Sequence, residues 1–227
     1  MPPSRDYSPT DERDLDTSIL QCTHAVLSSS HLATEGGSHP VLAFLLLTEA
    51  LYHRSLKFQQ LDDIKYCVKY LRYVRGQSRE TFDIAPLVTA LLVRALGFQA
   101  HLEPGHAMQD VEEMSDLCYK LLTSDVTESH LKDAVGDLAR AVIKIALSRN
   151  QHPSQQVIEC LRDANTRLPD LYDVTLALAL SLVIRFTVTR SLDDYEDAMT
   201  VSDKIISRSH SDGSQYSFLV FVLPPYL

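Results

Sequence analysis

The sequence predicts an all-α fold, arranged as an α-α superhelix of about four to five helix pairs. Apolar residues recur every three or four positions along most of the chain, the spacing that places them on one side of a helix. The chain has only 7 glycines, and no segment shows the sustained two-residue alternation of a half-buried strand. A similar helical phrase also recurs along the chain, which indicates a repeat architecture.

The recurring phrase begins a helix each time. LDDIKYCVKYLRYV from Leu61 and LDDYEDAMTVSDKII from Leu192 share an apolar stripe and two aspartates in the first turn, where the helix dipole favours negative charge. Related segments begin at Leu15, Met108 and Pro153, so that successive starts are 46, 47, 45 and 39 residues apart. We therefore expect about nine helices and essentially no sheet.

A more strongly apolar helix precedes each of the later copies. These first helices are predicted in LAFLLLTEALYHRSLKF, APLVTALLVRALGFQAHL, HLKDAVGDLARAVIKIAL and LYDVTLALALSLVIRFTV. The repeating unit is thus helix, turn, helix, with HLEPGHA after the second of these helices predicted as an inserted loop. One such pair cannot bury its apolar faces alone, but copies stacked side by side share a continuous core.

The repeat pattern also divides the chain. We expect residues 1–10 to be a disordered N-terminal segment and residues 11–212 to form the repeat domain. Residues 213–227 are apolar, and we interpret them as the start of a further repeat helix. The apolar run within that segment would suit docking or self-association.

Charge and hydropathy narrow the classes of partner. Thirty acidic and 21 basic residues give a net charge of −9, which argues against nucleic acid, because phosphate binding needs a surplus of Lys and Arg. The longest apolar runs, VLAFLLL and LALALSLVI, fall short of the about 20 apolar residues that a membrane span requires. The N-terminal residues lack the pattern of a secretory signal. We expect a cytoplasmic protein with no membrane partner.

The sequence offers little support for catalysis. The four cysteines, Cys22, Cys67, Cys118 and Cys160, lie 45, 51 and 42 residues apart, whereas zinc sites usually take two ligands from one short loop. No phosphate-binding glycine loop and no G-x-S-x-G segment occurs. We therefore predict no catalytic residue, no cofactor or cofactor-binding residue, no metal site and no enzymatic activity.

Several segments resemble one known family. KYCVKYLRYVRGQ, DVEEMSDLCYKLL and VIECLRDANTRLPDLYDVTLALALSLVIRF are similar to the divergent tetratricopeptide-like (TPR-like) repeat proteins of mushroom-forming fungi, roughly from Asp14 to Ser209. Members often carry such repeats ahead of a caspase-like (CHAT) peptidase domain. The chain departs from the familiar 34-residue pattern, has no Trp, and lacks the His and Cys segments of that peptidase.

The resemblance implies a non-catalytic scaffold that binds a protein or peptide partner in a concave helical groove. The alternatives are a repeat fragment of a caspase-like peptidase or other enzyme system, and a family member that retains no activity.

Four arginines recur in the first helices and are the candidate partner-binding residues: Arg54, Arg94, Arg140 and Arg185. First helices line the concave groove in TPR-like arrays, where such a ladder of cations would bind acidic residues or a peptide carboxylate. The favoured alternative is structural: each arginine pairs with a carboxylate of the next helix, such as Asp63, Asp110 or Asp194.

A second basic surface combines Lys65, Lys69 and Arg72 with Tyr66, Tyr70 and Tyr73. Basic residues interleaved with aromatics can bind RNA or an anionic membrane. Given the net charge, we favour a solvated outer face instead.

Overall fold

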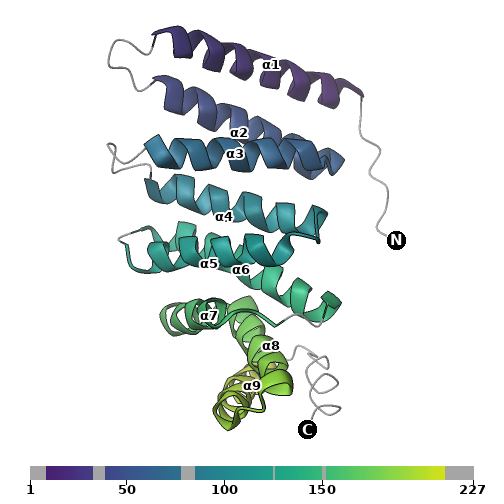
Figure 1. The fold of residues 1–227 in the computed structure, drawn as a ribbon, viewed down its shortest axis with the longest axis vertical. Coiled ribbons are helices and arrows are strands. Elements are labelled where there is room, and N and C mark those ends of the chain that lie inside the picture. Colours follow the sequence, from purple (N-terminus) through teal and green to yellow (C-terminus); the bar gives the residue numbers. More distant parts are fainter. Residues whose placement is uncertain (1–8, 33–38, 78–84, 125, 150–151, 213–227) are drawn as a thin grey trace.

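The computed structural model describes residues 9–32, 39–77, 85–124, 126–149 and 152–212 (Figure 1). Within these ranges it contains helices and no strand, which confirms the predicted all-α class. The nine described helices are α1 (Pro9–Leu32), α2 (His39–Phe58), α3 (Leu61–Gln77), α4 (Ala85–Leu102), α5 (Ala107–Leu122), α6 (Glu128–Arg149), α7 (Gln155–Arg167), α8 (Tyr172–Thr189) and α9 (Leu192–Asp212).

Two predicted segments fall largely outside this description. Of the N-terminal residues 1–10, only Pro9 and Thr10 are described, and they begin α1 rather than continuing a disordered segment. The apolar residues 213–227 lie outside the described residues altogether.

The helices form an elongated stack that runs from α1 at one end to α9 at the other (Figure 1). Each described helix packs against its neighbour in the chain, although α6 and α7 touch only slightly. In the second half of the stack, α4 also packs on α6, α6 on α8, and α5 on α7. Helices of one pair therefore contact the corresponding helices of the next pair, as expected for a helical repeat.

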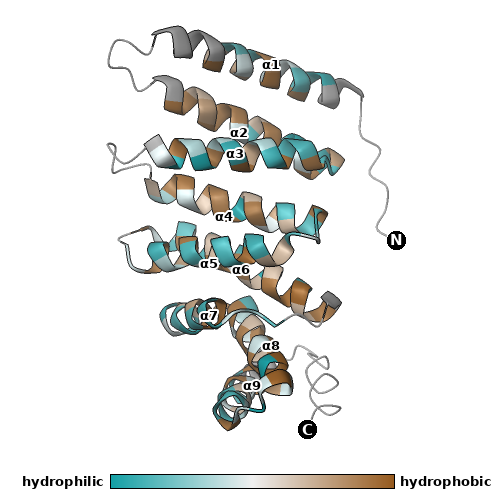
Figure 2. Ribbon diagram, in the orientation of Figure 1, coloured by the Kyte–Doolittle hydropathy of each residue, from teal (hydrophilic) through white to brown (hydrophobic). Residues whose placement is uncertain are grey.

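One continuous core runs through this stack. Its fully buried side chains come from both helices of the pairs and include Leu71, Leu96, Leu121, Leu138 and Leu178. In Figure 2 the apolar colour predominates on α4, whereas α3 and α5 show many polar residues. The first helices are thus the more apolar member of each pair, in agreement with the sequence pattern.

Two of the turns between paired helices have the same geometry. Gln59 after α2 and Arg190 after α8 are both left-handed, with φ of 55° and 57°. Each donates its backbone N–H to the carbonyl four residues earlier, at 2.8 Å. Only two residues then separate the helices of each pair, so the last turn of α2 lies beside the first turn of α3, and α8 is related to α9 in the same way.

The connection between α4 and α5 is longer. The predicted loop insertion is correct only in part, because α4 continues helically through Leu102 and the turn covers residues 103–106. Because α4 continues to Leu102, a residue beyond Arg94 faces α5.

Candidate binding groove

Arg54 holds its own helix pair together. Its Nε and Nη2 atoms each lie 2.6 Å from a carboxylate oxygen of Asp63, and its Nη1 lies 2.6 Å from Asp16 of α1. Asp63 is buried, and hydrogen bonding to it raises the pKa of Arg54. These contacts support the structural interpretation for this arginine.

Arg185 repeats the arrangement at the other end of the stack. Its Nε donates to Asp194 at 2.7 Å, its Nη2 pairs with the same carboxylate, and its Nη1 donates to Gln155 of α7. Arg140 is more exposed, but it bridges Asp137 at 2.6 Å and Asp173 of α8 at 3.2 Å. Both arginines therefore link helices within the stack.

Arg94 differs from the other three arginines. Its guanidinium carbon lies 5.5 Å from the centroid of the Tyr52 ring, and no ion pair joins it to any residue that the structure describes. The carboxylate expected as its partner, Asp110, instead accepts from the Gln99 amide at 3.3 and 3.4 Å. Because α4 continues to Leu102, eight residues past Arg94, whereas α2 ends four residues past Arg54, Gln99 rather than Arg94 occupies the turn nearest to α5.

A groove lies beside Arg94, between α2 and α4 and above α3. Along their described lengths, α2 and α4 pack much less closely than α4 does with α6 or α6 with α8. The space between them has a volume of about 370 Å³. Proteins bind drug-sized ligands in pockets of roughly 300–1,000 Å³, so this volume is large enough for several side chains of a partner. Its floor includes Cys67 and Leu71 of α3.

The two walls of the groove carry regular stripes. The α2 stripe consists of Leu42, Leu46, Glu49, His53 and Leu56, and the α4 stripe consists of Leu87, Leu91 and Arg94. Steps of alternately four and three residues are the spacing by which one helix packs lengthwise against another. Leu42 and Leu46 nevertheless remain 58% and 49% exposed.

Polar groups lie among these leucines. His53 Nε2 is 3.9 Å from the Glu49 carboxylate on the rim. The Tyr52 ring contacts Phe98 of α4 edge-on, with centroids 6.2 Å apart. Burial raises the pKa of Tyr52, and the adjacent Arg94 cation opposes that shift. The groove is therefore mainly apolar, with Glu49 and His53 on the α2 side and one cation, Arg94, on the α4 side.

The predicted basic and aromatic surface on α3 is largely engaged within the stack. Lys65 Nζ lies 2.9 Å from Glu103, and Arg72 Nε donates to Glu113 at 2.9 Å. Tyr66 and Tyr70 stack on each other, with centroids 6.3 Å apart. These ion pairs join α3 to the next helix pair and support the interpretation as a structural outer face.

The buried cysteines are poor nucleophiles. Burial raises the pKa of Cys67 and of Cys160 to about 12, and it raises that of Cys118 as well. Their thiols are therefore protonated at neutral pH. No cluster of three metal-ligating side chains occurs among the described residues.

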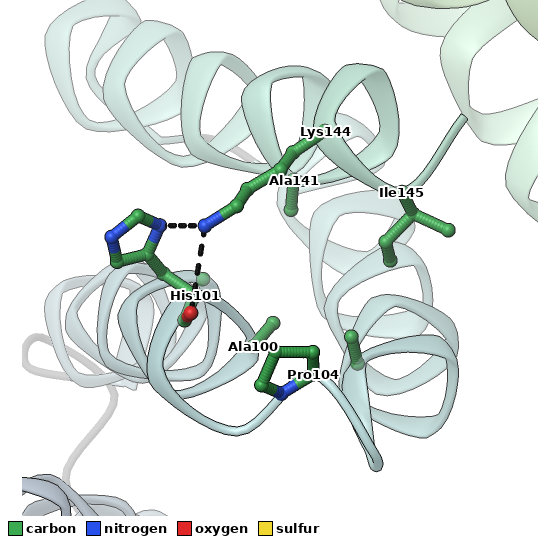
Figure 3. Close-up of a pocket in the computed structure, with 8 residues that line it drawn as sticks. Ala100, His101, Pro104, Ala141, Lys144 and Ile145 are labelled. Carbon is green, nitrogen blue, oxygen red and sulfur yellow. Dashed lines mark hydrogen bonds between the residues drawn. The ribbon is translucent and has the colours of Figure 1, made fainter. Parts of the chain in front are cut away.

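Two other hollows are less suited to a partner. The hollow between α4 and α6 has a volume of only about 30 Å³, and Lys144 contacts His101 Nδ1 at its edge (Figure 3). The hollow between α5 and α7 is larger, about 430 Å³, but most of the residues that line it are polar or charged. It is lined by Tyr119, Gln156, Glu159, Cys160, Arg162 and Asp163.

Two described helices, α4 and α8, are long and apolar enough to cross a membrane by length and composition. The uninterrupted apolar runs in the sequence are shorter than these helices, which include scattered polar residues. Core helices of folded domains pass the same test, and both helices contribute many side chains to the core here.

Comparisons with protein-family models, with curated proteins and with solved structures found no match to the chain. Membership of the fungal repeat family therefore stays a prediction based on the quoted segments.

Proposed function

We propose that this protein is a non-catalytic scaffold that binds a helical segment of a protein partner in the groove between α2 and α4. The observation that carries the proposal is the pair of helix-spaced stripes facing an unfilled space of about 370 Å³. Amphipathic helices bind such grooves through apolar anchors at positions i, i+3 or i+4, and i+7.

The exposed leucines support this proposal. In the later pairs, the first helices bury apolar side chains against one another, as α4 does against α6. Leu42, Leu46 and Leu87 remain accessible, so a partner helix would bury surface that the fold leaves exposed. The partner would occupy the position that a closer neighbouring helix occupies in the later pairs.

Arg94 adds a charge preference. A guanidinium at the edge of an apolar groove forms short, directional hydrogen bonds with a carboxylate, and such bonds strengthen as water is excluded. We therefore expect the bound helix to present an acidic residue beside Arg94. Of the four candidate arginines, we assign partner binding to Arg94, and structural roles to Arg54, Arg140 and Arg185.

We further propose that the chain is a cytoplasmic, TPR-like α-α superhelix related to the fungal repeat proteins, and that it binds neither nucleic acid nor a membrane. The acidic net charge supports the exclusion of nucleic acid. The buried, protonated thiols of α3, α5 and α7 give no support to the alternative of a cysteine peptidase.

Selection from a display library of amphipathic helical peptides tests the proposal. Enriched peptides should carry apolar residues in the helix spacing and an acidic residue, and they should lose at least about tenfold in affinity for the Leu46→Glu variant. Leu147→Glu is the matched control, because Leu147 is a similarly exposed leucine on α6, outside the groove. Peptides that bind both variants equally would contradict the proposal.

A further inference from the structure

The outer face of α9 carries a stripe that matches the groove. Leu192, Glu196, Met199 and Asp203 follow one another in steps of four, three and four residues. Leu192 is 72% exposed and Met199 is 36% exposed. No ion pair joins either carboxylate of this stripe to another described residue. The α9 stripe is therefore an accessible, amphipathic helix face with an acidic character.

One apolar position of this face is buried in the interior of the stack. Counted from the start of the recurring phrase, Met199 occupies the position of Val68 in α3 and Ser115 in α5. Those two residues are almost completely buried. Met199 thus occupies a position that packs against helices elsewhere in the repeat, whereas no described helix covers it in α9. The positions of Glu196 and Asp203 correspond to Lys65 and Arg72 of α3, which pair with Glu103 and Glu113 of the next helix pair.

The α9 stripe and the groove agree in spacing and charge. Both the α9 stripe and the α2 stripe follow the same alternating steps, so their side chains can interdigitate along parallel or antiparallel axes. Glu196 lies between Leu192 and Met199 in the α9 stripe, and Asp203 follows Met199. The groove carries Arg94 next to Leu91 on its α4 wall. A chain with a net charge of −9 repels its own copies in general, so local pairing of opposite charges is needed at such a contact.

We propose that the groove of one copy binds α9 of a second copy, with Leu192 and Met199 between the two leucine stripes and Glu196 or Asp203 paired with Arg94. This proposal rests on the proposed function of the groove and names its partner. The two surfaces are different parts of the chain, so the contact is heterologous. After one contact, the first copy keeps a free α9 and the second copy keeps a free groove, so the assembly extends as a chain or closes as a ring.

Sedimentation velocity measures this association across a range of protein concentrations. The wild-type chain should form larger species as its concentration rises from micromolar to hundreds of micromolar. Two charge reversals should each weaken association at least about tenfold. The first is Arg94→Glu in the groove, and the second is the Glu196→Arg/Asp203→Arg double variant in the α9 stripe. Lys132→Glu, a charge reversal at an exposed site on α6, should leave association unchanged.

The decisive experiment mixes the Arg94→Glu protein with the Glu196→Arg/Asp203→Arg protein. The Arg94→Glu groove then meets a basic α9, and the unaltered Arg94 groove meets an acidic α9, so both contacts of an alternating assembly regain opposite charges. Association should return in the equimolar mixture, although each protein alone stays monomeric. Circular dichroism of each variant confirms that the helices are retained.

The outcomes separate this inference from the proposed function. A wild-type chain that stays monomeric at every concentration overturns self-association, as does a mixture that fails to associate or an association that none of the reversals changes. If the groove still binds selected helical peptides in those cases, its binding function stands. If selection also yields no groove-dependent peptide, both proposals are wrong.

Discussion

Arg54 and Asp63 form a two-point ion pair in which two guanidinium nitrogens each lie 2.6 Å from a carboxylate oxygen. The similar segment around Arg94 has no such pair among the described residues, and that arginine stacks on Tyr52 instead. The same residue in two similar segments therefore has two different environments. One closes a helix pair, and the other lines a groove.

The Arg54 pair should contribute measurably to stability. Arg54→Ala leaves the buried Asp63 carboxylate without its main partner, so we expect the free energy of unfolding to fall by about 2–3 kcal/mol. Arg162→Ala removes a more exposed ion pair with Asp197 and should cost less than about 1 kcal/mol. Urea unfolding of both variants makes the comparison, and equal losses would refute the structural role of Arg54.

The helical periodicity and the repeat were sufficient to predict most of the fold. Leu61 and Leu192 were predicted to begin helices, and they are the first residues of α3 and α9. The start of α9 is also capped locally, since the Asp194 N–H donates to Ser191 Oγ at 3.4 Å. These features are local, because helix starts depend on nearby side chains.

The groove could not be predicted in the same way. Leu42 and Leu46 belong to an apolar run with the composition of a core helix, and only the distance between α2 and α4 leaves them exposed. The different environments of Arg54 and Arg94 also depend on tertiary structure. They arise because α4 continues further past its arginine than α2 does, so that its last turn places Gln99 beside Asp110. A sequence repeat indicates which positions correspond, but it does not give the spacing between helices.

Asp110 should make stability depend on pH. Burial raises the pKa of its carboxyl group to about 6, with partial opposition from Arg72 and Gln99. The folded state therefore holds this proton more tightly than the unfolded chain, and the stabilisation present at low pH is lost as pH rises from about 4 to about 6.

Asp110→Asn removes this titration while keeping an oxygen that can accept from Gln99. Relative to wild type, the variant should gain about 2 kcal/mol of unfolding free energy between pH 4 and pH 7. Urea unfolding at several pH values measures the difference between the two proteins. A difference that does not change with pH would show that the carboxyl group is not perturbed.

The left-handed residue after α2 offers a stabilising substitution. A side chain at positive φ is strained, so Gln59→Gly should raise the free energy of unfolding by about 0.5–1 kcal/mol. The neighbouring Gln60 has no positive φ, and Gln60→Gly should produce no gain. Thermal unfolding of the two variants distinguishes them. Equal effects would contradict the turn geometry.

The cysteines should differ in reactivity. Cys67, Cys118 and Cys160 are buried, whereas Cys22 of α1 is only partly buried. A thiol-reactive chromogenic disulfide at neutral pH should therefore label one thiol rapidly in the folded protein and all four in urea. Rapid reaction of three or four thiols without denaturant would mean that the core is more open than the structure indicates.

Leucine methyl NMR tests the helix-binding groove most directly. Spectra recorded while a selected helical peptide is added should show shifts for the methyl groups of Leu42, Leu46 and Leu87, with the Leu147 methyl groups unchanged. The same groove signals should change as the protein alone is concentrated, if α9 of a second copy is the occupant. Shifts at Leu147 or around the α5–α7 hollow, with the groove leucines unaffected, would contradict the account.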